Sequence, residues 1–219
     1  MINILGAGCI NRVSVSENFV TVLLRHVALD GLSVICGYAT LNQNSIIPTK
    51  EEKMALTLTS ESFGEGDYLG TDHVLSEAYG FGCNGGNLSP QLSWSGVPDG
   101  TESFAVTCYD PDAPTGSGFW HWVVANIPAS VTSLDLGAGD PSSGKMPAGG
   151  LEVRTDFGAP GYGGPCPPEG MHVHRYIFTV HACSLKELPV TADTSAAIVG
   201  FYLNFNTIEK ASLIGLYKR

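Results

Sequence analysis

The residues best suited to chemistry are aspartates and histidines that stand in short β-rich stretches or beside prolines. Asp110 and Asp112 lie in a turn that contains Pro111 and Pro114. Each proline fixes its own φ and pushes the preceding residue toward extended geometry, so the turn is stiff. A β-rich run then brings His121 back to it. An imidazole near a carboxylate can hold a proton and donate to an anion, so this arrangement predicts an anion-binding pocket.

A second stretch, residues 161–183, supplies the other side of the predicted pocket. It is rich in glycine and proline up to residue 170 and then reads as a strand over residues 176–180. Because side chains alternate along a strand, His174 and Tyr176 share one face and Arg175 points to the other. The backbone N–H groups of the glycines could add donors, since glycine lets the main chain approach a ligand. These glycines are Gly161, Gly163 and Gly164.

At these residues the chain resembles the phosphatidylethanolamine-binding protein family, in particular its bacterial and archaeal Raf-kinase-inhibitor-like branch. The resemblance covers about residues 56–219 and depends on five ordered motifs: NLSPQLSW (87–94), DPDAP (110–114), WHWVVANIP (120–128), RTDFGAPGYGGPCPP (154–168) and HRY (174–176). It implies a mainly β, Greek-key antiparallel sandwich with one or two short helices near the C-terminus. It also implies a small-anion pocket that accepts phosphate-like head groups, formed by the positions Asp110, His121, Pro167, His174, Tyr176 and Tyr217.

Together the residues and the resemblance predict a non-enzymatic protein that binds a small phosphorylated or carboxylated ligand without a cofactor. Asp112, Gly161 and Gly163 are expected to join the site residues that the resemblance implies. The resemblance further suggests regulation of a partner protein such as a kinase or protease. Between the DPDAP turn and His121, this chain has only the short segment 115–118, where some eukaryotic members of the family have an aromatic-rich segment. Because this short lip offers no wall for the rest of a lipid, we expect binding to depend on the head group alone.

Two other functions remain open from the residues. Asp110, Asp112, His121, His172 and His174 supply enough ligands for zinc, which would make a metal-dependent hydrolase. Strand alternation weakens this alternative, because His172, His174 and Tyr176 then form a row rather than a tetrahedral set. A serine hydrolase is disfavoured because the sequence has no GxSxG motif.

The elements that position these residues are predicted from alternation and turn signals. Strands are expected at residues 56–59, 73–75, 91–94, 103–109, 120–127, 176–180 and 212–217. The connection over residues 129–150 is either a functional loop or a plain surface crossover. One amphipathic helix is expected over residues 194–205, with Ala197, Ile198, Phe201 and Phe205 on its apolar face.

Composition restricts the class of protein. The chain has 219 residues, of which 43% are hydrophobic and 15% charged, with 27 glycines and 13 prolines. This composition predicts one compact domain rich in strands and turns. The net charge is −10, and residues 54–219 carry all of it. An acidic surface does not suit nucleic acid or anionic membranes, and no apolar run is long enough for a membrane-spanning helix. A homodimer is left open.

Residues 1–53 fit poorly with the rest and are predicted to be an N-terminal extension, with the domain at residues 54–219. Lys50, Glu51 and Glu52 precede Met54, and their codons could read as a ribosome-binding site. We therefore expect Met54 to be the true start; the alternative is a genuine but mobile extension. The segment lacks the features of a secretory signal peptide.

The six cysteines are expected to be reduced thiols of a cytoplasmic protein, although their even number would also allow disulfides. Cys108 and Cys183 stand in apolar strands and should pack as small hydrophobic residues. Arg175 is expected to form a buried ion pair, either with a carboxylate of the Asp110 turn or with Asp156.

Overall fold

The computed structural model describes residues 10–16, 19–24, 37–42 and 54–219. The chain separates into two units, Met1–Glu52 and Lys53–Arg219. In the first unit, three strands form an antiparallel sheet in the order β1-β2-β3: β1 (Ile10–Ser16), β2 (Phe19–Leu24) and β3 (Gly37–Asn42). Residues 50–53 lie outside the described residues, and the choice of Met54 as the start stays a prediction.

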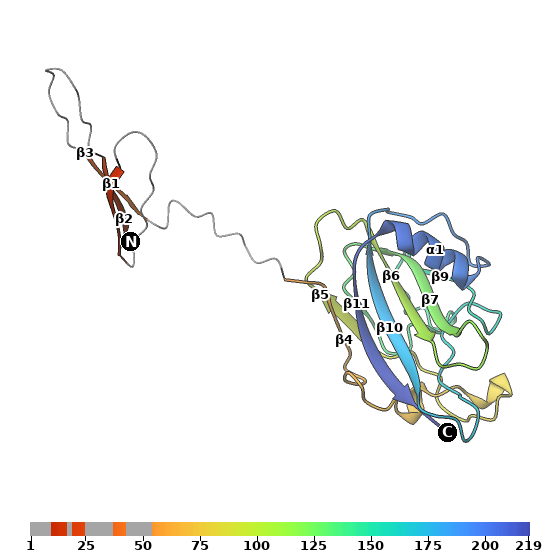
Figure 1. Ribbon diagram of the computed structural model, residues 1–219. Helices are drawn as coiled ribbons and strands as arrows, with labels where there is room; N and C mark the ends of the chain where they lie inside the picture. The colour runs from red at the N-terminus through yellow and green to blue at the C-terminus, as the bar shows by residue number, and fades with distance from the viewer. Residues whose placement is uncertain (1–9, 17–18, 25–36, 43–53) are drawn as a thin grey trace, which may run out of the picture. The chain divides into compact units, whose positions relative to one another are not determined.

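The second unit is built around a five-stranded antiparallel sheet in the order β11-β10-β6-β7-β9 (Figure 1). Its strands are β6 (Ser103–Asp110), β7 (Phe119–Pro128), β9 (Leu151–Glu152), β10 (His174–Cys183) and β11 (Thr207–Tyr217). β6 and its neighbour β10 are buried over most of their length, because both faces of the sheet are covered. β10 is longer than predicted, since its pairing with β11 begins at His174 and Tyr217.

A smaller antiparallel sheet covers one face of the larger one. It has the order β4-β5-β8 and consists of β4 (Thr57–Thr59), β5 (Leu92–Ser95) and β8 (Ser133–Leu134). The main core lies between the two sheets, where Leu92 and Leu134 pack in one cluster with Phe104, Trp122 and Phe178. Burying each such side chain contributes about 1.5–3 kcal/mol. The predicted mainly β sandwich is confirmed.

The opposite face of the large sheet is covered by helix α1 (Ala196–Asn206). Ser195 caps the helix, because its side chain accepts from the Ile198 N–H. The buried side chains of α1 are Ala196, Val199 and Leu203. The predicted apolar face was therefore wrong, since Ile198, Phe201 and Phe205 are exposed. The helix is apolar around most of its circumference, so periodicity did not distinguish the buried face.

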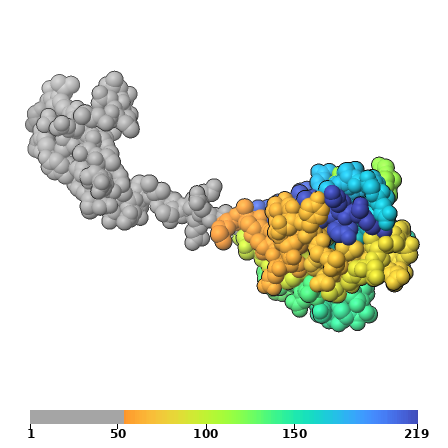
Figure 2. All heavy atoms as spheres, turned by 90° about the horizontal axis from the view of Figure 1, so that it is seen from below, coloured from red at the N-terminus to blue at the C-terminus, as the bar shows by residue number. Residues whose placement is uncertain are grey.

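The segment that follows β4 does not form the strand predicted at residues 73–75. It contains two short 3₁₀ helices, Thr71–His73 and Glu77–Tyr79. Its extended backbone is hydrogen-bonded in part to another loop, since the Leu75 N–H donates to Pro165 O, and in part within the segment, since the Asn87 N–H donates to Val74 O. The beginning of this segment lies along β11, where Tyr68 bridges Leu216, and Figure 2 shows it as the orange and yellow surface beside the blue C-terminal strand.

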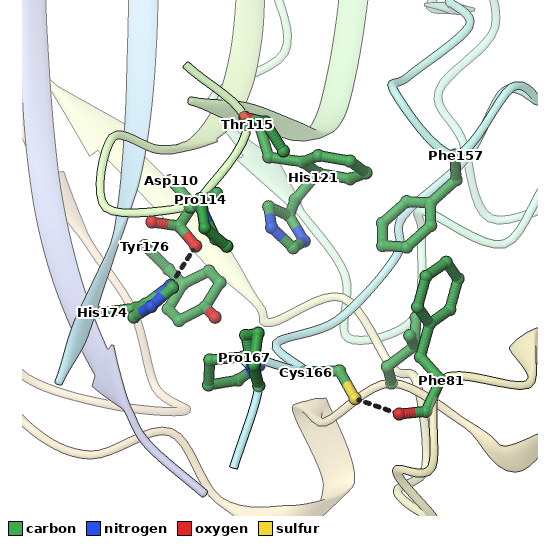
Figure 3. A pocket seen from close by; sticks show the side chains of 14 residues that line it. Phe81, Asp110, Pro114, Thr115, His121, Phe157, Cys166, Pro167, His174 and Tyr176 are labelled. Carbon is green, nitrogen blue, oxygen red and sulfur yellow. Dashed lines mark hydrogen bonds and ion pairs between the residues drawn. The ribbon is translucent and has the colours of Figure 1, made fainter. Parts of the chain in front are cut away.

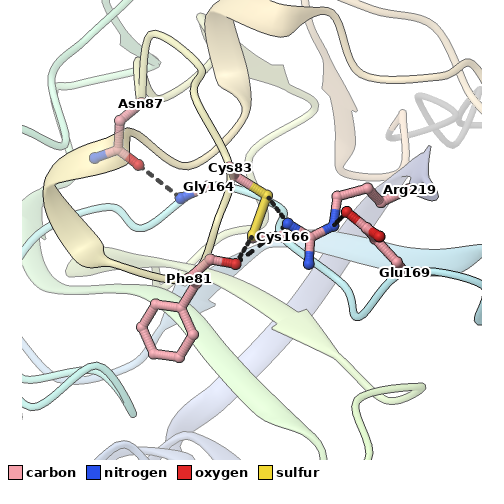
Figure 4. Close-up of a disulfide and its surroundings, with 7 residues drawn as sticks. All are labelled: Phe81, Cys83, Asn87, Gly164, Cys166, Glu169 and Arg219. Carbon is pink, nitrogen blue, oxygen red and sulfur yellow. Dashed lines mark hydrogen bonds and ion pairs between the residues drawn. A yellow bond between two sulfur atoms is a disulfide. The ribbon is translucent and has the colours of Figure 1, made fainter.

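The cysteines differ from the expectation. Cys83 and Cys166 form a disulfide with a Cα–Cα distance of 5.9 Å (Figure 4). The prediction of reduced thiols is therefore wrong for this pair. It is confirmed for Cys108 and Cys183, which are free and buried in apolar clusters. Cys9 and Cys36 lie outside the described residues. Within the described parts of the chain, no helix is long and apolar enough to cross a membrane.

Candidate ligand-binding pocket

The polar wall of the pocket forms where β6 ends and β10 begins. These strands run antiparallel with Tyr109 opposite Ile177, so Asp110 at the end of one comes beside His174 at the start of the other. His174 Nδ1 donates to Asp110 Oδ2 over 2.7 Å, and the two side chains are only 1% and 3% exposed. Asp110 Oδ1 accepts from the Asp112 N–H at 2.8 Å. Both oxygens of the buried carboxylate are thus satisfied.

His121 on β7 forms the back of the pocket. Its Nδ1 donates to Gly163 O over 2.7 Å, and the Gly163 N–H donates to His121 O at 2.9 Å. Loss of solvent on burial lowers the pKa of His121, which favours the neutral ring. The ring lies edge-on to Tyr176, with centroids 5.0 Å apart. Burial raises the pKa of the Tyr176 phenol, so its hydroxyl stays protonated and can donate.

The opposite wall is apolar and aromatic. The Phe157 ring contacts Phe119 at 4.8 Å and Phe81 at 6.0 Å between centroids. Figure 3 shows His174, Tyr176 and Asp110 on one side of the space and Phe81 and Phe157 on the other. His121 lies between the two groups, with its ring centroid 5.4 Å from that of Phe157. The cavity has a volume of about 160 Å³. Its other lining residues include Leu75, Ala113, Pro114, Thr115, Cys166, Pro167 and Pro168.

His174 Nε2 carries the clearest sign of a missing partner. The atom is buried and has no hydrogen-bond partner among the described residues, whereas Nδ1 of the same ring is held by Asp110. Leaving a buried polar atom unsatisfied costs about 1–3 kcal/mol. Because His174 lines the cavity, a ligand in that cavity could supply the missing hydrogen bond.

Five of the nine residues predicted for the site line the cavity: Asp110, His121, Pro167, His174 and Tyr176. Asp112 does not, although it belongs to the same turn. Its carboxylate accepts from Arg175 Nε and Nη2, each at 2.8 Å, and from the Arg175 N–H at 3.0 Å. These bonds hold the pKa of the Asp112 carboxyl at about 2, below its ordinary value. Asp112 therefore fixes the turn to β10.

The glycines and Tyr217 also have positions other than those expected. The Gly163 and Gly164 N–H groups donate to His121 O and Asn87 Oδ1, so neither is free for a ligand. A side chain on Gly164 would collide with His73 O, which explains the glycine by close packing. Gly161 and Tyr217 are not among the lining residues. Tyr217 packs instead against the cluster of Val74, Leu75 and Cys83.

The family to which this chain belongs is shown by comparison with known proteins. A family model described as phosphatidylethanolamine-binding protein matches residues 59–218. The chain belongs to the phosphatidylethanolamine-binding protein family. Within it, the UPF0098 protein YbcL of Escherichia coli K12 is 49% identical over 174 residues, which cover 80% of this chain and 93% of YbcL. The UPF0098 protein YbhB of the same organism is 48% identical, over 74% of this chain and 99% of YbhB.

Solved structures of the phosphatidylethanolamine-binding protein family have the same fold. The crystal structure of E. coli YbcL superposes with a TM-score of 0.73 at 51% identity and covers 76% of this chain and 99% of YbcL. The phosphatidylethanolamine-binding protein homologue CT736 of Chlamydia trachomatis has a TM-score of 0.62 at 27% identity, over 75% and 98% of the two chains. The family resemblance inferred from the motifs is thereby confirmed.

Sequence reasoning missed the aromatic wall of this family member. Phe119 stands two residues before His121 on one strand, so alternation alone could have placed both on one face. Phe157 stands inside the RTDFG stretch but had no periodic pattern to indicate its direction. Phe81 lies between Gly80 and Gly82, both with positive φ, and nothing local indicated that it reaches the pocket.

The ligand set considered for zinc does not come together. Among the described residues, no group of three or more His, Cys, Asp or Glu side chains could hold a metal ion. Asp112 is engaged by Arg175, and His172 stacks on His174 at 5.2 Å between centroids without joining the lining residues. The arrangement of side chains therefore does not favour the metal-dependent hydrolase.

Proposed function

We propose that this protein is a non-enzymatic binding protein whose pocket takes a small molecule bearing a phosphate or carboxylate group. The observation that supports this most directly is His174 Nε2, a buried atom on the cavity wall without a partner in the described chain. With Nδ1–H given to Asp110, a proton on Nε2 would point a second donor into the cavity. An anion oxygen would complete that hydrogen bond.

The electrostatics of the wall suit a ligand of limited negative charge. The Asp110 carboxylate lies directly behind His174, so it would balance the imidazolium that a bound anion favours. His121, whose pKa is lowered, would stay neutral and contribute through hydrogen bonding. The protonated Tyr176 hydroxyl would add a third polar contact. Charge-assisted hydrogen bonds of this kind are about twice as strong as neutral ones.

The aromatic wall extends the proposal beyond the head group. Phe81, Phe119 and Phe157 offer a surface for an apolar substituent next to the anion, which was not expected from the short lip. The cavity of about 160 Å³ is smaller than the roughly 300–1,000 Å³ that is usual for drug-sized ligands. We therefore expect an anionic group with a small apolar or aromatic substituent. The family's name refers to a phosphate-bearing lipid head group, which has the same polar chemistry.

Calorimetric titration of the purified protein with phenyl phosphate and with inorganic phosphate tests this function. Phenyl phosphate should bind more tightly, and His174→Gln should remove most of its binding. His181→Gln is the matched control, because His181 lies on the same strand outside the pocket. If the parent binds neither compound, or if both variants behave alike, the proposal is contradicted. The expected regulation of a protein partner stays a prediction.

A further inference from the structure

The disulfide joins two segments that each contribute residues to the lining of the pocket. Cys166 itself lines the cavity between the polar end and the aromatic wall. Cys83 is 83 positions earlier in the chain and follows Phe81, another lining residue, by two positions. The bond therefore connects the tip of the loop over residues 75–88 to the loop over residues 163–168 (Figure 4).

In the loop over residues 75–88, contacts other than the disulfide hold the two ends better than the tip. At one end the Leu75 N–H donates to Pro165 O at 3.1 Å, and at the other Asn87 Oδ1 accepts from the Gly164 N–H at 2.8 Å. Phe81 at the tip is 58% exposed and lies between two glycines of positive φ. Its ring contacts Phe157, and its carbonyl accepts from Arg219 Nη1 at 3.2 Å. The disulfide is the one covalent tie on this part of the described chain.

The surroundings of the two sulfurs favour attack on Cys166 Sγ, with Cys83 as the leaving thiolate. Cys166 is partly exposed and lines the pocket, so an attacking thiolate can approach its sulfur from the cavity. Cys83 is 6% exposed, and its sulfur lies 3.6 Å from Arg219 Nη1. A guanidinium beside a sulfur stabilises the thiolate and so makes Cys83 the better leaving group.

We propose that the Cys83–Cys166 disulfide is a redox clamp that holds Phe81 in the aromatic wall of the pocket and so regulates ligand affinity. This inference rests on the proposed function. A thiolate of a dithiol reductant attacks Cys166 Sγ, and Cys83 leaves as a thiolate. The second thiol of the reductant then displaces Cys166 from the mixed disulfide. Two electrons and two protons pass from the dithiol to the cysteines, and the reductant becomes a disulfide.

Reduction releases the tip with Phe81 while the anchored ends of the loop keep their hydrogen bonds. The anion site formed by Asp110 and His174 is left intact, because neither residue touches the disulfide. A ligand that uses both walls then loses affinity, whereas one that uses the anion site alone loses little. With the Phe81 tip disordered we expect about a tenfold loss of affinity for phenyl phosphate, since part of the binding energy goes into ordering the loop.

The test compares phenyl phosphate binding by the oxidised full chain with binding after dithiothreitol treatment and anaerobic desalting. The double variant Cys83→Ser/Cys166→Ser should bind like the reduced parent and should not respond to dithiothreitol. This variant is also the matched control, because it retains all the other cysteines. Hydrogen exchange of the backbone at residues 77–83 should rise on reduction, whether or not a ligand binds.

These readouts separate the clamp from the proposed function. If the oxidised protein does not bind phenyl phosphate but exchange at residues 77–83 rises on reduction, the proposed function fails and the loop clamp stands. If binding is present and both affinity and exchange are equal in the two redox states, the clamp is overturned.

A third variant tests whether Cys83 is the leaving group when the disulfide is reduced. Arg219→Gln should slow reduction of the disulfide by dithiothreitol severalfold. Lys218→Gln removes a neighbouring exposed charge and should leave the reduction rate unchanged. Equal rates in Arg219→Gln and the parent would contradict the role of Cys83 as the leaving group.

Discussion

His174 donates to Asp110 over 2.7 Å where β10 begins beside the end of β6, and this buried pair connects the fold to the pocket. The carboxylate sets which ring nitrogen carries the proton, because Nδ1 must donate to it. The other nitrogen is thereby left for the cavity. The turn is held from the opposite side as well, since Asp112 is bound to Arg175.

Replacement of Asp110 by asparagine should reduce binding and stability together. The amide can accept from His174 Nδ1 but cannot balance an imidazolium, and its NH₂ group would disturb the contact with the Asp112 N–H. We expect a loss of about 1–3 kcal/mol in the free energy of unfolding. Thermal unfolding and calorimetric titration with phenyl phosphate measure the two effects. A silent Asp110→Asn variant would remove Asp110 from the site.

Anion affinity should be greater at pH 6 than at pH 8. An anion oxygen at His174 Nε2 needs a proton on that nitrogen in addition to the one on Nδ1, so binding takes up a proton and weakens as pH rises. The expected difference is about 1–2 kcal/mol. Phenyl sulfate is the suitable probe, because its own charge is constant over this range. The dependence should disappear in His174→Gln, and a pH-independent affinity in the parent would count against a proton on His174.

Arg175→Ala should have a small effect. The ion pair with the Asp110 turn was predicted correctly, but the expectation that it is buried was wrong, because the Arg175 side chain is 52% exposed. An exposed pair contributes about 0–1 kcal/mol. The contribution is present above the ordinary pKa of aspartate and is lost as pH falls toward about 2, the pKa of Asp112 in the fold. Melting curves at pH 7 and pH 3 measure it, and phenyl phosphate affinity should not change.

Much of the fold and of the polar wall could be predicted, because both depend on local patterns. Alternation placed His174 and Tyr176 inside and Arg175 outside, as β10 has them. Prolines located the turn that carries Asp110. The predictions failed where packing outside the local pattern decides, as at the buried face of α1 and at residues 73–75, whose backbone bonds to the Pro165 loop and to Gly85 and Asn87 of their own segment.

The disulfide and two residues of the aromatic wall, Phe81 and Phe157, could not be predicted for the same reason. Phe81 and Cys83 lie in a glycine-rich loop without periodicity, and their partners Phe157 and Cys166 are far away in the sequence. Cysteine spacing alone does not determine pairing, because pairing requires the fold to bring two Cα atoms within reach. The positions of Phe81 and Phe157 in the pocket therefore follow from the fold and not from the local sequence.

Glu152→Gln should stabilise the protein at alkaline pH. Glu152 on β9 accepts from Trp122 Nε1 at 3.1 Å, and burial raises the pKa of its carboxyl to about 8. A raised pKa means that the folded state holds a proton which the unfolded state has lost, so the parent loses stability as pH rises from about 4.5 to 8. Glutamine keeps an acceptor for the indole N–H and has no proton to lose.

The gain in the free energy of unfolding from Glu152→Gln should be small at pH 5 and reach about 1–3 kcal/mol at pH 9. Urea unfolding at both pH values measures it. Glu102→Gln is the control. Because Glu102 is exposed, this variant should change the free energy of unfolding by the same small amount at pH 5 and at pH 9. A difference between parent and Glu152→Gln that stays constant from pH 5 to pH 9 would mean that the Glu152 carboxyl titrates as it does in the unfolded chain, in spite of its burial beside Trp122.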